Sequence, residues 1–251
     1  MAGGVEAPLA RRARWQMGTL VEVAADLPAV ALEPAFAGVQ RVDARMSTFR
    51  ADSDVSRLNR AQPGVRVPMH ADTLHVLRAA LALHALTDGA FDAACGSGGR
   101  TAGFAVARDE AWRTGAHVHV SLDGIAKGFA VDVGVAALLS VGATRGWVNA
   151  GGDLRVFGAL SLPVEQRAGG GARRLLLCNR AMATSEYGAG RRVTSASTLH
   201  GRCGRVPRSY GATVIAHQCM IADALTKAVA VRRRRAGKWA RALDADVLWR
   251  A

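Results

Sequence analysis

The stretch LDGIAKGFAVD, residues 122–132, joins an alternating segment to a long apolar one. Residues 117–124 alternate between polar and apolar side chains and predict a strand, whereas residues 125–143 predict a helix that ends at Gly142. Gly124 and Gly128 would let the backbone approach a neighbour or a ligand closely. Lys127 stands at the expected helix start beside backbone N–H groups, an arrangement that suits a phosphate. A tight strand–helix connection with a surface lysine explains the same residues equally well.

The remaining segments of the chain predict strands and helices that are interspersed without a regular βαβ rhythm. Strands are expected at residues 18–25, 146–158 (two, joined by an Asn-Ala-Gly-Gly-Asp turn), 173–185 and 211–218. Helices are expected at residues 28–45, after a Ser53 cap, from an Asp72 cap to Gly89, and at 219–235, with loops at 96–116 and 186–210. This order predicts an α+β fold of mixed sheets with packed helices. We expect residues 1–251 to form a single domain, in which two α+β lobes would enclose the site.

The composition is that of a folded protein without a membrane span. Half of the 251 residues are hydrophobic, and no run approaches the roughly 18 apolar residues that a span needs. The first thirty residues lack the apolar core of a signal peptide, so we expect a cytoplasmic protein unless the start is truncated, in which case periplasmic export stays open. The four cysteines show no C-x-x-C spacing, which argues against a zinc site.

The net charge of +13 requires that a polyanionic partner be considered. The arginines are spread along the chain and aromatic residues are only 5%, a composition that does not favour nucleic acid. The densest basic cluster, residues 232–235, is typical of a solvated helix end. A phosphate-bearing ligand would also suit this charge.

Two further segments allow a structural and a functional interpretation. TDGAFDA, residues 87–93, is typical of a helix end with Gly89 left-handed and Phe91 in the core, or it forms a backbone cradle for a ligand. In ADALTK, residues 222–227, Asp223 and Lys227 stand four apart on one helix face. Alone, that spacing favours an ion pair over a binding site.

Taken in order, these segments resemble the flavin transferase family, also called the ApbE family of FAD:protein FMN transferases. The matching segments are MGT (17–19), MSTFRADSDVSRLN (46–59), TDGAFD (87–92), LDGIAKGFAVD (122–132), VNAGGDLRVFG (148–158), AMATS (181–185) and TVIAHQCMIADALTK (213–227). The resemblance implies an ApbE-like fold and a metal-dependent transferase that uses FAD and Mg²⁺. Such an enzyme moves FMN to a Ser or Thr of a target flavoprotein and releases AMP. Two alternatives stay open: an FAD pyrophosphatase that gives FMN and AMP, and an inactive flavin-binding protein.

The resemblance also implies roles for individual residues. Those expected to bind FAD are Met17, Phe49, Ala90, Phe91, Asp92, Lys127, Thr198 and Leu199. The carbonyl of Gly124 and the carboxylate of Asp223 are expected to hold the metal. Asp223, Lys127 and His200 are the expected catalytic residues. Where the family often shows His-x-x-Asp-Pro, this chain has Ser197 and His200 with no proline after them, so either His200 takes over a general-base or hydrogen-bonding role or the site is lost.

The chain departs from the family pattern at Lys227. Many members have a metal-ligating threonine four residues after the aspartate, whereas this chain has Thr226 one place early and Lys227 at the ligand position. A protonated lysine has no lone pair to offer a cation. Three interpretations are therefore open: the pKa of Lys227 is lowered, the metal has fewer protein ligands than in other members, or the ammonium supplies part of the metal's charge.

Overall fold

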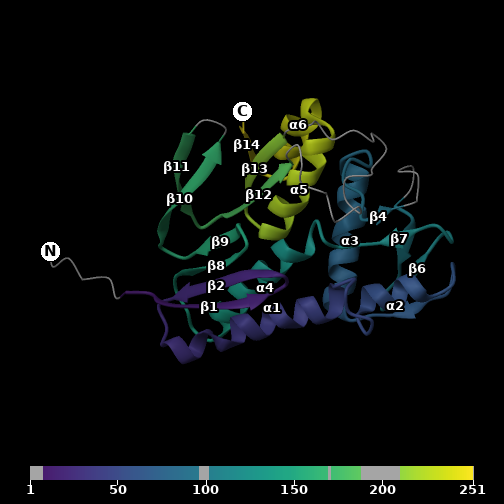
Figure 1. The fold of residues 1–251 in the computed structure, drawn as a ribbon, viewed down its shortest axis with the longest axis horizontal. Helices are drawn as coiled ribbons and strands as arrows, with labels where there is room; N and C mark the ends of the chain where they lie inside the picture. The colour runs from purple at the N-terminus through teal and green to yellow at the C-terminus, as the bar shows by residue number, and fades with distance from the viewer. Residues whose placement is uncertain (1–7, 96–101, 169–170, 188–209, 251) are drawn as a thin grey trace.

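The structure, a computed structural model, describes residues 8–95, 102–168, 171–187 and 210–250 (Figure 1). Its main sheet has seven strands in the order β1-β2-β8-β9-β12-β13-β14, and every neighbouring pair is antiparallel. The strands are β1 (Ala10–Gln16), β2 (Thr19–Ala25), β8 (Gly146–Ala150), β9 (Asp153–Phe157), β12 (Ala181–Tyr187), β13 (Tyr210–Ala216) and β14 (Asp246–Arg250).

Three helices pack on this sheet and on one another. They are α1 (Glu33–Met46), α4 (Ala126–Ser140) and α5 (Cys219–Val231). Helix α4 lies between the other two and contacts β8 and β9, while α5 lies on β12 and β13. The expected helix after residue 125 and its end near Gly142 are confirmed, as is the turn between β8 and β9.

A second group of helices and strands, formed by residues 54–120, lies beyond the end of α1, on the right of Figure 1. It contains α2 (Asp54–Arg60), α3 (Ala71–Leu86), the small sheet β3-β6-β5 and the pair β4–β7. These short strands are β3 (Val67–Pro68), β4 (Ala94–Cys95), β5 (Phe104–Val106), β6 (Glu110–Arg113) and β7 (His119–Val120). The prediction of a loop over residues 96–116 is therefore wrong for its described part, and the strand expected at residues 117–124 is shorter. One hydrophobic core runs from the main sheet into this part, and the assignment of residues 1–251 to a single domain stays a prediction.

The remaining elements surround the main sheet. A hairpin of β10 (Ser161–Ala168) and β11 (Gly171–Cys178) covers a small second core, and η1 (Ala29–Leu32) precedes α1. The helix expected to reach residue 235 ends at Val231 instead. It is followed by η2 (Arg233–Arg235) and α6 (Ala236–Ala242), so it is not the last element. Among the described residues, no helix is both long and apolar enough to cross a membrane.

The helix caps confirm one prediction and correct another. Ser53 caps α2 by accepting a hydrogen bond from Ser56 N, as expected. Asp72 does not cap α3; the cap is His70, whose side chain accepts from Asp72 N, while the Asp72 carboxylate lies 2.7 Å from the Arg45 guanidinium. The competing ion pair explains this difference, because a carboxylate held by an arginine on α1 is not free to turn to its own helix start.

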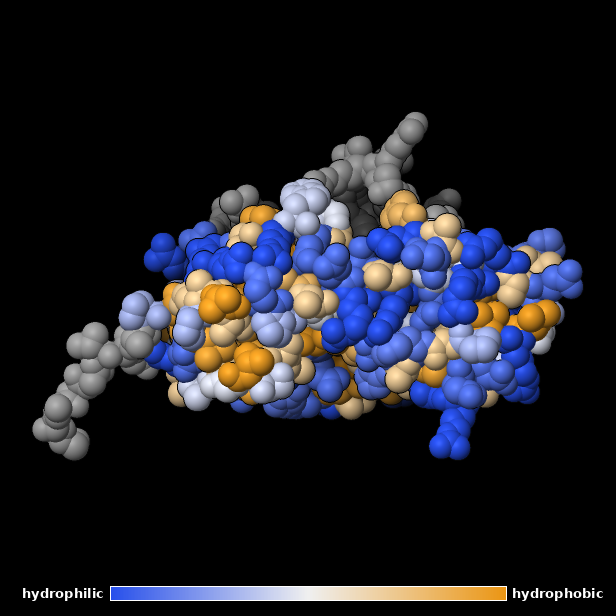
Figure 2. Space-filling model, turned by 90° about the horizontal axis from the view of Figure 1, so that it is seen from below, coloured by the Kyte–Doolittle hydropathy of each residue, from blue (hydrophilic) through white to orange (hydrophobic). Residues whose placement is uncertain are grey.

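Hydrophilic side chains dominate the face seen in Figure 2, with a larger group of hydrophobic ones on its left and a smaller group on its right. Large apolar side chains exposed on the described surface include Trp15, Leu20 and Val30, in or near the first two strands and η1. Scattered exposed apolar residues are normal on folded proteins. The site described next lies where α1, α4 and the first hairpin meet.

Candidate active site

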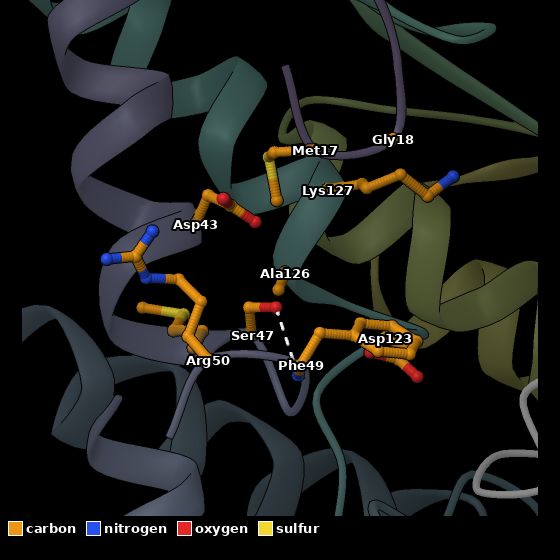
Figure 3. Close-up of a pocket in the computed structure, with 10 residues that line it drawn as sticks. Met17, Gly18, Asp43, Ser47, Phe49, Arg50, Asp123, Ala126 and Lys127 are labelled. Atoms are coloured by element: carbon orange, nitrogen blue, oxygen red, sulfur yellow. Dashed lines mark hydrogen bonds between the residues drawn. The ribbon is translucent and has the colours of Figure 1, made fainter. Parts of the chain in front are cut away.

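A pocket of about 400 Å³ opens where three segments meet (Figure 3). They are the β1–β2 turn, the last turn of α1 with the residues after it, and the connection into α4. The lining residues are Met17, Gly18, Asp43, Met46, Ser47, Phe49, Arg50, Asp123, Ala126 and Lys127. Its size lies within the range of roughly 300–1,000 Å³ typical of small-molecule sites.

The apolar side of the pocket follows from two local conformations. Met17 and Gly18 have φ angles of 51° and 69° and link the paired residues Gln16 and Thr19. A two-residue turn with both φ angles positive has the twist that a tight antiparallel hairpin needs. Phe49 follows the end of α1, where its N–H donates to Ser47 Oγ at 3.3 Å, and its side chain is 92% exposed. Met17 and Phe49, both expected to contact FAD, therefore line one pocket and leave a large apolar surface uncovered.

The charged side of the pocket is Lys127, in the first turn of α4. Its Nζ lies 3.0 Å from Asp153 Oδ2, and the lysine side chain remains 36% exposed. The nearby carboxylate of Asp153 raises the pKa of Lys127, so the ammonium is charged at neutral pH. The backbone N–H groups expected to bind phosphate here are partly engaged: Ala126 N donates to Leu122 O, and Gly128 N donates to Asp223 Oδ2. At this helix start an anion would therefore bind the Lys127 ammonium and not the N–H groups of Ala126 and Gly128.

Asp153 is a site residue that sequence reasoning did not assign. It begins β9 directly after Gly151 and Gly152, whose φ angles of 64° and 102° turn the chain back towards α4. Its side chain is buried, and burial together with the charge of Asp223 raises the pKa of Asp153 to about 6, against the opposing effects of Lys127 and Lys227. The sequence feature that could have indicated Asp153 is its position directly after the glycine pair in NAGGDL. Its partner, Lys127, is 26 residues away in the sequence, so no local pattern connects the two.

Asp223 and Lys227 form the ion pair that their spacing favoured. Asp223 is fully buried in α5, and its Oδ1 accepts a hydrogen bond from Lys227 Nζ. The same ammonium lies 3.1 Å from Ser185 Oγ on β12. Gly128 N donates to Asp223 Oδ2 at 3.2 Å, which ties this pair to the start of α4.

The two ion pairs are neighbours because α4 and α5 approach very closely. A Cβ on Gly128 would lie 2.3 Å from the carbonyl oxygen of Cys219. Asp132, one turn further along α4, accepts from the N–H groups of Cys219 and Met220 at the start of α5. We call Lys127, Asp153, Asp223 and Lys227 the charge quartet. It contains two cations and two carboxylates, and both carboxylates are buried.

The other expected site residues do not line the pocket. Ala90 and Phe91 are buried, and the Phe91 N–H donates to Thr87 Oγ1, which confirms the interpretation of TDGAFDA as a helix end packed into the core. Asp92 is also buried and accepts from Ala94 N. Gly124 is buried between the pocket residues Asp123 and Ala126. Thr198, Leu199 and His200 lie outside the described residues.

The described residues do not fit a divalent metal. They contain no group of three or more His, Cys, Asp or Glu side chains that would hold one. Each oxygen of Asp223 already accepts a hydrogen bond, one of them from an ammonium. Thr226 does not replace a ligand at position 227, because its hydroxyl lies 2.6 Å from Asp223 O and 2.7 Å from Ser185 Oγ.

Known proteins share both the sequence pattern and the fold. The FAD:protein FMN transferases of Haemophilus influenzae and Vibrio cholerae are 30% and 31% identical to this chain, over 149 and 147 residues. These matches cover 47% and 48% of this chain, and 43% and 44% of the two relatives, so the chain spans less than half of their length.

Solved structures extend the comparison to the whole chain. A single-site mutant of the flavin transferase ApbE from Vibrio cholerae superposes with a TM-score of 0.83 at 22% identity, covering 97% of this chain and 94% of that one. The apo form of the flavinyl transferase ApbE from Pseudomonas stutzeri gives a TM-score of 0.80 at 21% identity, covering 97% and 91%. The fold is thus that of the flavin transferases, which confirms the α+β prediction. A sequence model of the ApbE family matches residues 17–249, and the chain belongs to that family.

Proposed function

We propose that this protein is an FAD:protein FMN transferase that moves FMN from FAD to a Ser or Thr of a target flavoprotein and releases AMP. The observation that carries the proposal is one pocket with an exposed aromatic ring, Phe49, and a charged lysine, Lys127, at a helix start. A dinucleotide with a flat ring system and a pyrophosphate presents the complementary features. Membership of the ApbE family and the names of its relatives support the same substrate.

In this proposal Phe49 and Met17 bind a ring of FAD. Aromatic rings stack with an energy of about 0.5–1.5 kcal/mol beyond the area they bury. The thioether of Met17 adapts to irregular apolar surfaces and also contacts aromatic faces favourably. Because Phe49 is 92% exposed, its ring has a free face before any ligand binds.

Lys127 is proposed to bind the pyrophosphate. Its pKa is raised by Asp153, so it carries a full positive charge at neutral pH, and the positive end of the α4 dipole adds to it. Negative charge builds up on the departing AMP phosphate as the reaction proceeds. A cation fixed beside that phosphate stabilises the transition state more than the ground state.

The reaction that these residues would serve is a displacement at phosphorus. The hydroxyl oxygen of the acceptor Ser or Thr bonds to the FMN phosphorus, and the bond from that phosphorus to the bridging oxygen breaks. AMP leaves with the bonding electrons, and the hydroxyl proton passes to a base. With water as the acceptor the same step gives free FMN and AMP, which is the pyrophosphatase alternative.

Magnesium was expected from the resemblance to the family. The described residues do not fit it, because both oxygens of Asp223 are engaged and a lysine stands at the third ligand position.

The test is to incubate the protein with FAD and a candidate acceptor flavoprotein, then measure AMP by chromatography and the acceptor by mass spectrometry. A covalent adduct of FMN mass with stoichiometric AMP is expected. Lys127→Met should lower the rate at least tenfold, whereas Lys238→Met, an exposed lysine on α6, should leave it unchanged. AMP with free FMN and no adduct would favour the pyrophosphatase. Neither AMP nor adduct with any acceptor would overturn the proposal.

A further inference from the structure

We propose that the Lys227 ammonium takes the place of the divalent metal beside Asp223, so that this protein cleaves FAD without a metal ion. The inference rests on the proposed function for its substrate, but not for the site itself. The family resemblance implies magnesium at Asp223, whereas the residues that surround Asp223 offer it an ammonium and a backbone N–H.

The ammonium occupies the position next to the carboxylate where a cation would bind. Lys227 Nζ donates to Asp223 Oδ1 and to Ser185 Oγ, at 3.1 Å from the latter, so it bridges α5 and β12. The lysine is 8% exposed, and its charge is therefore held in place by protein rather than by water. Buried ions persist when they are paired and hydrogen-bonded, and both conditions hold here.

Among the described residues, the polar side chains nearest to Asp223 are already hydrogen-bonded or ion-paired. Asp223 Oδ2 accepts from Gly128 N, and Asp153 Oδ2 lies 3.0 Å from the Lys127 ammonium. The Thr226 hydroxyl is hydrogen-bonded to Asp223 O and Ser185. A metal that binds Asp223 Oδ1 or Asp153 Oδ2 would have to displace an ammonium from that oxygen.

The net charge of the quartet also argues against a bound divalent metal. Two ammonium groups face two carboxylates, so the cluster is neutral without a metal. A divalent cation would add two positive charges to this buried cluster and repel Lys127 and Lys227. With threonine at position 227, the remaining three groups would carry a net charge of −1, which would attract a cation instead of repelling it.

The composition of the chain supports a specific use of lysine. Of 33 basic residues only three are lysines, namely Lys127, Lys227 and Lys238, and two of these belong to the quartet. An ammonium is a compact charge with three donors, closer in shape to a metal ion than the planar, forked guanidinium. In a chain that otherwise uses arginine, two of the three lysines stand beside the buried carboxylates of the quartet.

Lys227 is thus a positioning residue: its ammonium holds Asp223 and Ser185 in place and supplies positive charge beside them. A purely structural lysine would also stabilise the fold, so stability alone does not test the idea. The distinguishing consequence is that removing the ammonium should create a metal site.

The experiment measures binding of Mn²⁺ by electron paramagnetic resonance in the absence of FAD. It compares the full chain with Lys227→Thr and with the control Lys238→Thr on the exposed face of α6. Wild type and the control should show no saturable site, whereas Lys227→Thr should gain one saturable Mn²⁺ site with a Kd at least tenfold below the highest Mn²⁺ concentration titrated. Saturable one-to-one binding to the wild type, abolished by Asp223→Asn, would overturn the proposal. If Lys227→Thr fails to fold, the wild-type titration still decides it.

Activity provides the second measurement. Wild-type AMP release from FAD should change less than twofold after EDTA treatment. Lys227→Thr should lose at least tenfold in EDTA and recover on addition of Mg²⁺. A wild type that EDTA inactivates would refute metal independence. A wild type that releases no AMP under any condition refutes the proposed function instead, and the Mn²⁺ titration then judges the cation site separately.

Discussion

The replacement Gly128→Ala tests whether the α4–α5 contact holds the site together. An added Cβ would lie 2.3 Å from Cys219 O, 2.6 Å from Cys219 C and 2.8 Å from Met220 Cα. All three are backbone atoms, so no side chain can rotate to make room. The helices must separate, and the 3.2 Å hydrogen bond from Gly128 N to Asp223 Oδ2 must lengthen.

The size of the effect follows from two opposing contributions. Alanine stabilises a helix interior by about 1 kcal/mol relative to glycine. Overpacking typically costs about 1–3 kcal/mol, and contact with rigid backbone puts this site at the upper end. The expected net loss is therefore about 2 kcal/mol, which for a chain of this length corresponds to roughly 4–8 °C in Tm.

Gly134 in the same helix provides the matched control. Its added Cβ would meet two methyl groups of Val148 at 3.2 and 3.4 Å, and these belong to a side chain that can adjust. Gly134→Ala carries the same gain in helix propensity, so its stability should stay close to that of the wild type. The assay is urea unfolding followed by far-UV circular dichroism, with FAD affinity measured by fluorescence quenching. Equal stability and FAD affinity in the two variants would refute the close α4–α5 contact as the support of the site.

Three further predictions concern single side chains. Asp223→Asn removes the carboxylate beside the buried Lys227 ammonium, so we expect a loss of about 3–5 kcal/mol in urea unfolding. The double variant Asp223→Asn/Lys227→Met should recover much of that loss, and a double variant no more stable than the single one would contradict the pairing. Phe49→Ala should raise the Kd for FAD by roughly 2- to 12-fold, since stacking contributes about 0.5–1.5 kcal/mol, and it should leave stability nearly unchanged because the side chain is exposed. Calorimetric titration with FAD measures this, and an unaltered Kd would remove Phe49 from the site. Burial raises the pKa of Asp54, but hydrogen bonds from Thr73, Arg57 and His70 outweigh it, so the folded-state pKa lies below 3.8. The stability that this carboxylate contributes is present above pH 3.8 and is lost as the pH falls through the lower folded value. Asp54→Asn should therefore lower the free energy of unfolding by about 2 kcal/mol at pH 7 and by progressively less below pH 3.8. Urea unfolding at a series of pH values measures this difference. A difference that does not change with pH would contradict the hydrogen-bonded carboxylate.

The elements with a local cause were predictable from the sequence. The apolar segment after residue 125 forms α4, the glycine pair at 151–152 forms a tight turn, and Ser53 caps a helix. Each rests on residues that are near one another in the chain. The i,i+4 pair of Asp223 and Lys227 belongs to the same class, since helix geometry alone brings the two side chains together.

The elements that depend on distant partners were not predictable in this way. Strands β5 and β6 were assigned to a loop because they are short, and Arg113 on β6 is a buried residue that a polar pattern would place outside. Its guanidinium donates to the carbonyl oxygens of Leu58 and Val118, the first of them 55 residues away. Strand β14 was missed for a similar reason, because it is defined by pairing with β13.

The charge quartet shows why a family motif and a local pattern lead to different interpretations of the same residue. By spacing, Lys227 is the partner of Asp223; by resemblance, it stands where a metal ligand belongs. The structure places Lys127 of α4 and Asp153 of β9 beside this pair. The charge of Lys227 therefore has to be considered together with the three other charges of the quartet. Since the balance is complete with two ammonium groups, the lysine at position 227 is consistent with a working site. A threonine there would leave one carboxylate charge that only an added cation could compensate.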